Sequence, residues 1–519
     1  MLIKAMILSK RQILSGKISI ITLLLLLFFS GTVSCNSYDN SQYTQQTTIF
    51  PNTPMETTIT VPVSSCRVRK ISVIPDLNSL SVNTNNVLEN FQTQELNCRD
   101  KKTIQVRTSV PLLLEEYPFS QFKAKTNHMF GAQLAGQANR TLPKSVYPTK
   151  IELNKRQETI FRIMSLSGVG IARDFFSYGT RRFIIEKKKG KYNFSGSDFL
   201  TELSRKYNID LIGRLSLHYG DPRKQGQPED MASYLAYVEA VAERYDGDGD
   251  LGCEFQFPDC YSKGDGQNPA PSPKERYNWG KNHQIRYWEL LKEPAPGRRQ
   301  RVGNEAGLTP AHSREILKAS FASIKAVAPD VKVFFAGMGP VNNSGYTENS
   351  YFEEMMSGGG ANYFDIAGVD AFTRPVTEKI SQYHMVLQKF RNSKPIWVAQ
   401  TGVPDSKGHR IILPNGGGTP DAQCIYVANA FTKAFAAGAE KVFWGDFIDN
   451  SKTARKRITI WDSTGLFETE TWKLKPAYFT YKLMAAALYD FSSVDKISPS
   501  IYKFTFTDRS TVYVLLPNM

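Results

Sequence analysis

The sequence predicts an α/β fold, a (β/α)8 TIM barrel over residues 127–490, with a signal and tether before it and small β additions at both ends. Two observations lead to this prediction. Eight short apolar runs alternate with longer amphipathic stretches over roughly 360 residues, the pattern and length that a barrel of eight parallel strands requires. Two of the amphipathic stretches also begin with a helix-capping threonine followed by proline. A doubly wound open sheet is the alternative, because periodicity alone cannot show that a sheet closes.

The predicted strands are short runs rich in β-branched and aromatic residues, as buried parallel strands usually are. They span residues 130–134, 170–176, 210–216, 287–291, 331–336, 365–369, 395–400 and 441–445.

The predicted helices lie between these runs. One begins at Thr309-Pro310 and carries apolar residues at helical spacing on one face, namely Leu317, Phe321, Ile324 and Ala328. Another begins at Thr419-Pro420 in the same way, and the last covers residues 476–490 after the eighth strand.

Residues 1–34 are predicted to be a secretory signal. MLIKAMILSKRQILSGK is basic, ISIITLLLLLFF is a short apolar run, and small residues precede Cys35. This ending resembles a bacterial lipoprotein signal, in which Cys35 would become the lipidated N-terminus, although Thr32 stands where leucine is usual. A single membrane anchor is the alternative, but the apolar run is short for one. We therefore expect an exported protein, either a lipoprotein of the cell envelope or a secreted one.

Three further segments complete the predicted organisation. Residues 35–60 are rich in Ser, Thr, Gln and Asn and are expected to be a flexible linker. Residues 61–126 contain short β-like runs and form a small β-rich extension, while residues 491–519 hold two β runs around DRS and are expected to form a hairpin.

The charge of the chain is basic and dispersed. Four of the 64 basic residues lie in the signal, and the remaining 60 exceed the 49 acidic residues, so the net charge falls from +15 to +11. Only residues 184–191 and 452–457 form local basic clusters. For an exported chain this favours a solvated surface facing an anionic envelope or glycan over nucleic-acid binding.

The cysteines are expected to serve structure. Export permits disulfides, and Cys253 with Cys260 and Cys66 with Cys98 are the plausible pairs. Cys424 lies in a helical pattern and is expected to be a buried thiol. No spacing of cysteine and histidine indicates a zinc site.

The catalytic residues of a barrel of this kind lie at the carboxyl ends of its strands. Polar residues follow five of the predicted strands there, namely Arg173-Asp174, Lys292-Glu293, Asp370, Gln400 and Asp446 after Trp444.

The segments RDFF, VAERYDGDGD, YWELLKEP, KPIWVAQTGVP, FW and LKPAYFTYKL together resemble the clan A glycoside hydrolases, retaining (β/α)8 glycosidases, and in particular family 39-like and β-xylosidase-like members. The resemblance covers residues 127–490. It implies that Glu293, at the end of the fourth strand, occupies the place of the general acid/base. It also implies an oligo- or polysaccharide as partner and no cofactor or metal.

Three diagnostic positions depart from the pattern of that group. Lys292 stands where the group has Asn, which contacts the sugar 2-hydroxyl, and Gln400 stands where it has the nucleophilic Glu. Asp370-Ala371-Phe372 replaces His-x-Tyr. A retaining glycosidase needs two carboxyls about 5 Å apart, and an uncharged amide cannot form the glycosyl ester. If Lys292 points into the site, it would favour ionised Glu293 and so weaken it as a general acid.

These departures lead to three hypotheses. The chain is a glycan-binding protein that is impaired as a glycosidase, or an active O-glycosyl hydrolase in which Asp370 supplies the second carboxylate, or a barrel that serves only protein–protein contact. Measurable turnover would separate the second hypothesis from the others.

Four further features bear on the site, and three of them have two interpretations each. Arg173 is expected to support the side chain of the seventh strand, since a buried arginine needs a partner. Trp444 is either a sugar-stacking platform or a core residue, and Asp446 either a site group or a capping residue. Residues 246–250, DGDGD, look like a calcium loop but lack the Glu that an EF-hand requires at its twelfth position, so a polar helix end is preferred.

Overall fold

The computed structural model describes the chain in several stretches. The backbone is described for the strands at 57–62, 68–73, 93–94, 103–108 and 112–116 and for residue 150. Backbone and side chains are described for residues 126–133, 151–173, 179–221, 224, 226–249, 280–295, 307–338, 346–372, 374–406, 418–449, 462–469 and 471–516.

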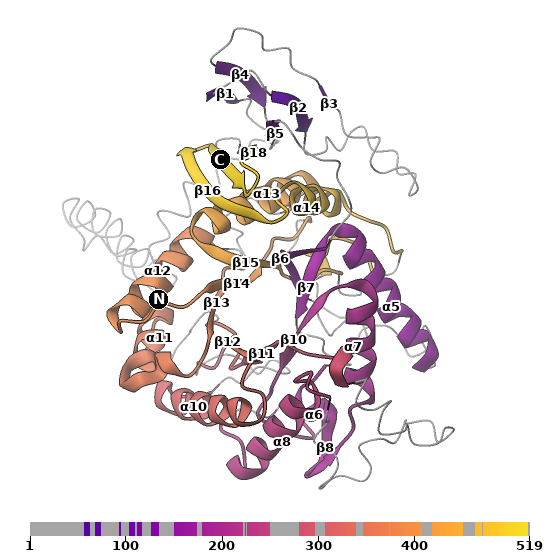
Figure 1. Cartoon of the computed structure of the whole chain (residues 1–519), viewed down its shortest axis with the longest axis vertical. Helices are drawn as coiled ribbons and strands as arrows, with labels where there is room; N and C mark the ends of the chain where they lie inside the picture. The colour runs from indigo at the N-terminus through magenta and orange to yellow at the C-terminus, as the bar shows by residue number, and fades with distance from the viewer. Residues whose placement is uncertain are drawn as a thin grey trace, which may run out of the picture. The chain divides into compact units, whose positions relative to one another are not determined.

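Eight parallel strands close into a barrel, as predicted, and the open sheet is excluded (Figure 1). Neighbours around the barrel follow the order β10-β11-β12-β13-β14-β15-β6-β7. The strands are β6 (Asn127–Gln133), β7 (Val169–Arg173), β10 (Asp210–Arg214), β11 (Tyr287–Leu290), β12 (Lys332–Phe335), β13 (Ile366–Asp370), β14 (Ile396–Thr401) and β15 (Ala439–Trp444). Each coincides with one of the predicted runs, with bounds that differ by a few residues.

Helices surround this ring of strands (Figure 1). They are α5 (Lys150–Ser167), α6 (Arg182–Ile185), α7 (Ser195–Tyr207), α8 (Met231–Arg244), α10 (Pro310–Val327), α11 (Glu348–Met356), α12 (Val376–Lys389), α13 (Pro420–Ala436) and α14 (Pro476–Ala487). A 3-10 helix, η3 (Ser357–Asn362), follows α11, and a small hairpin of β8 (Glu186–Lys188) and β9 (Lys191–Tyr192) follows α6.

Both predicted threonine caps are present. The hydroxyl of Thr309 accepts a hydrogen bond from the amide of His312 at 3.2 Å, and that of Thr419 accepts one from Ala422 at 3.1 Å. Each bond satisfies an amide that the first helical turn leaves without a partner. The apolar face predicted for α10 is also confirmed, since Leu317 and Ile324 are fully buried in the core.

The inside of the barrel is filled rather than open. Side chains from six strands meet there in one apolar cluster, formed by Ile171, Ile212, Phe334, Ile366, Trp397, Ala399 and Phe443. Because this layer occupies the interior, polar chemistry is confined to the ends of the barrel.

The two ends of the chain share a second sheet. Its order is β16 (Phe491–Ser498), β17 (Ile501–Phe506), β18 (Thr511–Leu515), β5 (Leu112–Glu116), β2 (Val68–Val73) and β3 (Thr93–Gln94), all antiparallel. The predicted C-terminal hairpin is β17 with β18. The sequence did not reveal β16 or the pairing of β18 with β5, which joins the N-terminal extension to the hairpin.

Several predictions fall on residues outside the described stretches. These are the signal, Cys35, Asp174, most of the linker, and the cysteines of both proposed disulfides. One part of the predicted linker is a strand, because β1 (Thr57–Pro62) pairs with β4 (Thr103–Thr108). Cys424 is a free, buried thiol, as predicted. Within the described stretches, every helix is too short or too polar to cross a bilayer.

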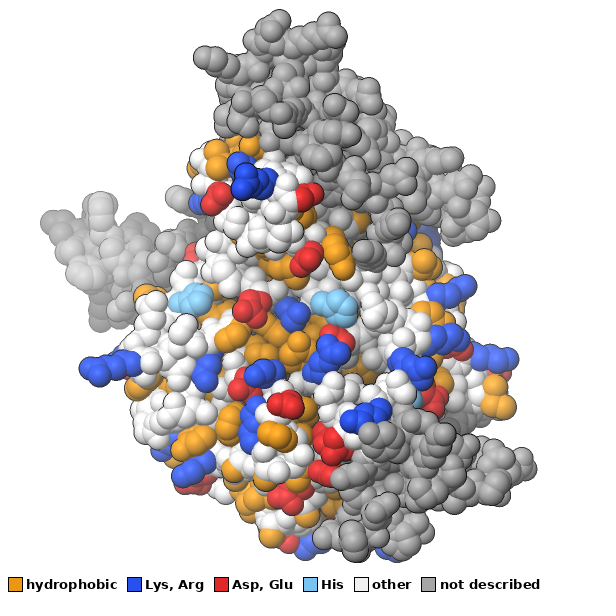
Figure 2. Space-filling model, in the orientation of Figure 1, with side chains coloured by type: hydrophobic (Ala, Val, Ile, Leu, Met, Phe, Trp, Pro, Cys, Tyr) orange, Lys and Arg blue, Asp and Glu red, His pale blue; other side chains and the backbone are white. Residues whose placement is uncertain are grey.

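Charged side chains of both signs are interspersed on the face of the molecule seen in Figure 2, around a centre of hydrophobic side chains. On this face the excess of basic residues forms no continuous patch, which agrees with the dispersed charge of the sequence.

Candidate functional site

A buried ion-pair cluster lies at the carboxyl end of the barrel. Arg173, at the end of β7, contacts Oε2 of Glu289 through Nε at 2.8 Å and Nη2 at 2.7 Å. Arg214, at the end of β10, places Nε 3.5 Å from Oε1 of the same carboxylate. Burial favours a raised pKa for Glu289, but the charges of Arg173 and Arg214 outweigh it and hold that pKa below its usual value. Glu289 is therefore an ionised carboxylate between two cations.

Arg173 also contacts β6, which neighbours β7, and β14, which does not. Its Nη1 donates to Oε1 of Gln133 at 3.4 Å and to the carbonyl oxygen of Ala399. Ala399 precedes Gln400 on β14, so Arg173 holds the backbone next to Gln400. Its predicted support of the Gln400 side chain stays a prediction.

The chain leaves β11 in an unusual conformation. Leu291 and Glu293 both have left-handed backbone, with φ of 54° and 53°, a region that residues other than glycine seldom occupy. The amide of Glu293 donates to the carbonyl of Gly337 at 3.2 Å. Lys292 and Glu293 are 8% and 6% exposed. Such backbone costs free energy and is typical of functional sites.

Lys292 is an amine in an unusual electrostatic environment. Its pKa is lowered to about 7, first by burial and then by the like charges of Arg173 and Arg214, while Glu293 and Glu289 oppose the shift. Near neutral pH a large fraction of this amine is uncharged, so its influence on Glu293 depends on pH.

Asp370 and Gln400 lie side by side, because β13 and β14 pair at these two residues. The pKa of Asp370 is raised to about 6, first by burial and then by the negative charge of Glu293. Lys292 also acts electrostatically on Asp370. Asp370 pairs with Gln400 and interacts electrostatically with Glu293 and Lys292, so the structure brings these four residues together.

Phe372 was not among the predicted site residues, yet it packs beside Gln400. A methyl group in place of a hydrogen of Gly402 would lie 3.0 Å from Cε2 of Phe372. At Gly445 such a group would lie 3.1 Å from Cδ2 of Phe372 and 2.9 Å from Cγ of Gln400. The ring of Phe372 therefore packs against Gly402 and Gly445, the glycines that follow β14 and β15, and the side chain of Gln400 packs against Gly445.

The two candidates after β15 differ in their contacts. Trp444 is fully buried, donates its indole N–H to the carbonyl of Thr464 at 3.0 Å and meets Tyr426 edge-on. These are the contacts of a core residue, and a sugar-stacking role for Trp444 stays a prediction. Asp446 is buried and accepts a hydrogen bond from Nε2 of Gln133 at 3.3 Å, which connects it to the Arg173 network.

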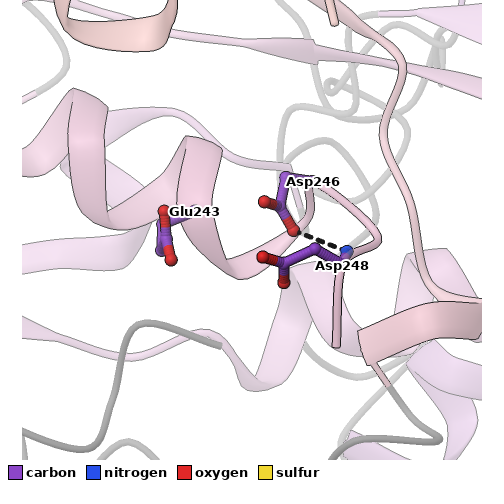
Figure 3. A group of neighbouring side chains, drawn as sticks. All are labelled: Glu243, Asp246 and Asp248. Atoms are coloured by element: carbon purple, nitrogen blue, oxygen red, sulfur yellow. Dashed lines mark hydrogen bonds between the residues drawn. The ribbon is translucent and has the colours of Figure 1, made fainter. Parts of the chain in front are cut away.

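The DGDGD stretch contributes two residues to an acidic cluster at the end of α8 (Figure 3). Carboxylate oxygens of Glu243, Asp246 and Asp248 lie within 4.8 Å of one another. Asp246 accepts a hydrogen bond from the amide of Asp248 at 2.9 Å, and its carbonyl accepts one from Gln284 at 2.6 Å. These bonds are those of a polar turn after a helix, and we assign no ion to the cluster.

No protein-family model matches the sequence, and no curated protein is similar enough to count as a relative. Solved structures do share the fold. A family 39 glycoside hydrolase from the gut symbiont Bacteroides cellulosilyticus WH2 matches with a TM-score of 0.52 and 13% identity, over 89% of this chain and 87% of that one. A glucosidase from Croceicoccus marinus matches with a TM-score of 0.47 and 14% identity, over 76% and 75% of the two chains. The barrel therefore shares its fold with the family 39 glycoside hydrolase.

Proposed function

We propose that this chain is an exported glycan-binding protein built on a glycoside hydrolase-like barrel, and that it is impaired as a retaining glycosidase. One observation carries the proposal. At the end of β14, beside Asp370, the side chain is the amide of Gln400. A retaining mechanism requires a carboxylate there, about 5 Å from the acid/base, to attack the anomeric carbon.

The surroundings of Glu293 support the same proposal. A general acid must hold a proton at the working pH, and an adjacent ammonium favours the ionised carboxylate. Lys292 is the residue before Glu293, and wherever the pH lies below its lowered pKa the protonated amine interacts favourably with the Glu293 carboxylate. Gln400 can still donate and accept hydrogen bonds, so the loss of catalysis need not mean the loss of binding.

A second candidate function is an O-glycosyl hydrolase that uses Glu293 together with Asp370. The observation that favours it is the raised pKa of Asp370, which burial and the charge of Glu293 produce together. Two carboxyls whose environments separate their pKa values are typical of acid/base pairs. An inverting mechanism would need them about 6.5–9.5 Å apart.

Location and covalent state belong to the proposal as well. We expect removal of residues 1–34, lipidation of Cys35 at the cell envelope, and disulfides between Cys66 and Cys98 and between Cys253 and Cys260. Mass spectrometry of the mature protein, with peptide mapping before and after reduction, tests all of these. A mature protein that keeps residues 1–34 or shows only free thiols would contradict them.

Binding and turnover should be measured on the same purified protein with the same glycan panel. The proposal predicts saturable binding of at least one oligosaccharide without release of products. Turnover that disappears in Glu293→Gln and in Asp370→Asn would instead support the hydrolase. Absence of both binding and turnover across the panel would leave a barrel for protein–protein contact.

A further inference from the structure

Lys475, Asp449 and Asp405 form a second buried cluster of charged side chains. Nζ of Lys475 lies 2.6 Å from Oδ2 and 2.8 Å from Oδ1 of Asp449, and 3.0 Å from Oδ2 of Asp405. An amine that contacts both oxygens of a carboxyl group lies next to the carbon that joins them. The side chains of Lys475 and Asp449 are 6% and 5% exposed, so bulk water has little access to this contact.

The backbone holds the amine and the carboxyl in this contact. The amide of Asp449 donates to the carbonyl of Phe467 at 3.0 Å, and the amide of Lys475 donates to the carbonyl of Leu466 at 2.9 Å. The amide of Gly465 donates to Oδ1 of Asp449 at 2.7 Å, and a methyl group on Gly465 would lie 2.1 Å from the amide nitrogen of Asp449. Because both residues are fixed to the same short segment, their side chains are positioned as two reactants in one molecule, which lowers the entropic cost of a reaction between them.

The surroundings favour the uncharged forms of both groups. An amine attacks a carbonyl carbon only when it is unprotonated, and a neutral carboxyl accepts that attack far better than a carboxylate does. Burial raises the pKa of Asp449 to about 7, and the charge of Asp405 adds to this rise, although Lys475 opposes it. Transfer of one proton from the ammonium to Asp449 then gives a neutral pair. Fully buried apolar residues flank the pair along the chain and disfavour separated charges, namely Phe447, Ile448, Leu466 and Phe467.

We propose that Lys475 and Asp449 form an intramolecular isopeptide bond between Nζ and Cγ, with Asp405 as the proton carrier. The neutral amine attacks Cγ and forms the C–N bond. One of its protons passes through the carboxylate of Asp405 to the hydroxyl of Asp449, whose C–O bond breaks, and one water molecule leaves. Asp405 is regenerated, and the reaction needs no oxidant, reductant or other co-reactant. The bond joins residues 26 positions apart and fixes the segment after β15 to the start of α14.

The test is mass spectrometry of the purified, reduced protein, first intact and then after digestion with trypsin. We expect the parent to be lighter than its composition requires by one water molecule, and peptide 442–452 to be joined to peptide 474–482. Lys475→Arg keeps the positive charge but offers no amine that can be acylated, so it should lose no water. Asp405→Asn keeps the shape of the side chain but cannot carry the proton, so most of its molecules should stay unlinked.

The pair of Lys379 and Glu348 is the matched control within the same digest. Nζ of Lys379 lies 2.9 Å from Oε2 of Glu348, and the two side chains are only 14% and 7% exposed. Arg374 also pairs with this carboxylate and holds it in the ionised form, which an amine does not attack. The peptides that carry Lys379 and Glu348 should therefore be recovered separately.

Three outcomes are decisive, and none of them depends on glycan binding. Recovery of peptides 442–452 and 474–482 only as separate species from the folded parent would overturn the proposal, whether or not the variants fold. Linkage of Lys379 to Glu348 as well would show unspecific condensation and overturn it too. Full linkage in a folded Asp405→Asn, checked by thermal unfolding, would overturn the role of Asp405 alone.

Discussion

Replacement of Glu289 by glutamine should destabilise the barrel strongly, because this one carboxylate balances two buried cations. Arg173 holds Oε2 through two nitrogens at 2.8 and 2.7 Å, and Arg214 lies 3.5 Å from Oε1. All three side chains are at most 3% exposed, so water cannot take the place of the lost charge. Breaking a buried ion pair from one side costs about 3–5 kcal/mol. That is a large part of the roughly 5–15 kcal/mol by which a protein is usually stable.

The assay is urea unfolding of parent and Glu289→Gln, followed by tryptophan fluorescence at neutral and acidic pH. The pKa of Glu289 is lowered in the fold, so its contribution is present above the unfolded value of about 4.5 and is lost as the pH falls through the folded value. The difference between parent and variant should therefore shrink in acid. Glu158→Gln, which removes the partner of Lys206 in a largely exposed pair, is the control and should leave the unfolding midpoint unchanged. A cost below about 1 kcal/mol for Glu289→Gln would refute the reasoning, because it would mean that the two guanidinium groups do not depend on this charge.

Two further predictions concern the same end of the barrel. An amine-acylating reagent should modify Lys292 with a pH midpoint near 7, because its pKa is lowered to about 7, as peptide mapping by mass spectrometry would show. Modification of Lys292 only well above pH 9 would contradict the proposed environment of the amine. Gly402→Ala should lower the free energy of unfolding by about 1–3 kcal/mol, because the added methyl would lie 3.0 Å from Phe372 and 3.2 Å from the carbonyl of Gly445. Urea unfolding measures this, and an unchanged midpoint would mean that the ring does not rest on Gly402.

The sequence alone was sufficient to predict the barrel, because each strand and helix is encoded by a local pattern of residues. The apolar runs locate the strands, and the Thr-Pro pairs at 309–310 and 419–420 locate two helix starts that the structure confirms through their caps. Since all parallel strands of a barrel end at the same side, Glu293, Lys292 and Asp370 could also be expected to meet there.

Other features depend on partners far apart in the sequence. The role of Glu289 follows from Arg173 and Arg214 on two other strands, although a charged residue inside an apolar run already indicates a buried partner. Phe372 looks like any aromatic residue until Gly402 and Gly445 are seen beneath it. The pairing of β5 with β18 joins the two ends of the chain, and no local pattern encodes such a contact.

Release of aryl leaving groups from a panel of aryl glycosides tests the central claim most directly. Four proteins are measured side by side: the parent, Gln400→Glu, and each of these two with Glu293→Gln added. The account predicts that the parent is inert and that Gln400→Glu gains activity which Glu293→Gln removes, because the single missing charge is restored next to an acid/base carboxyl. Turnover by the parent that Glu293→Gln abolishes would contradict the account. It would show a working hydrolase with a second carboxylate elsewhere, and Asp370 would be the first residue to replace.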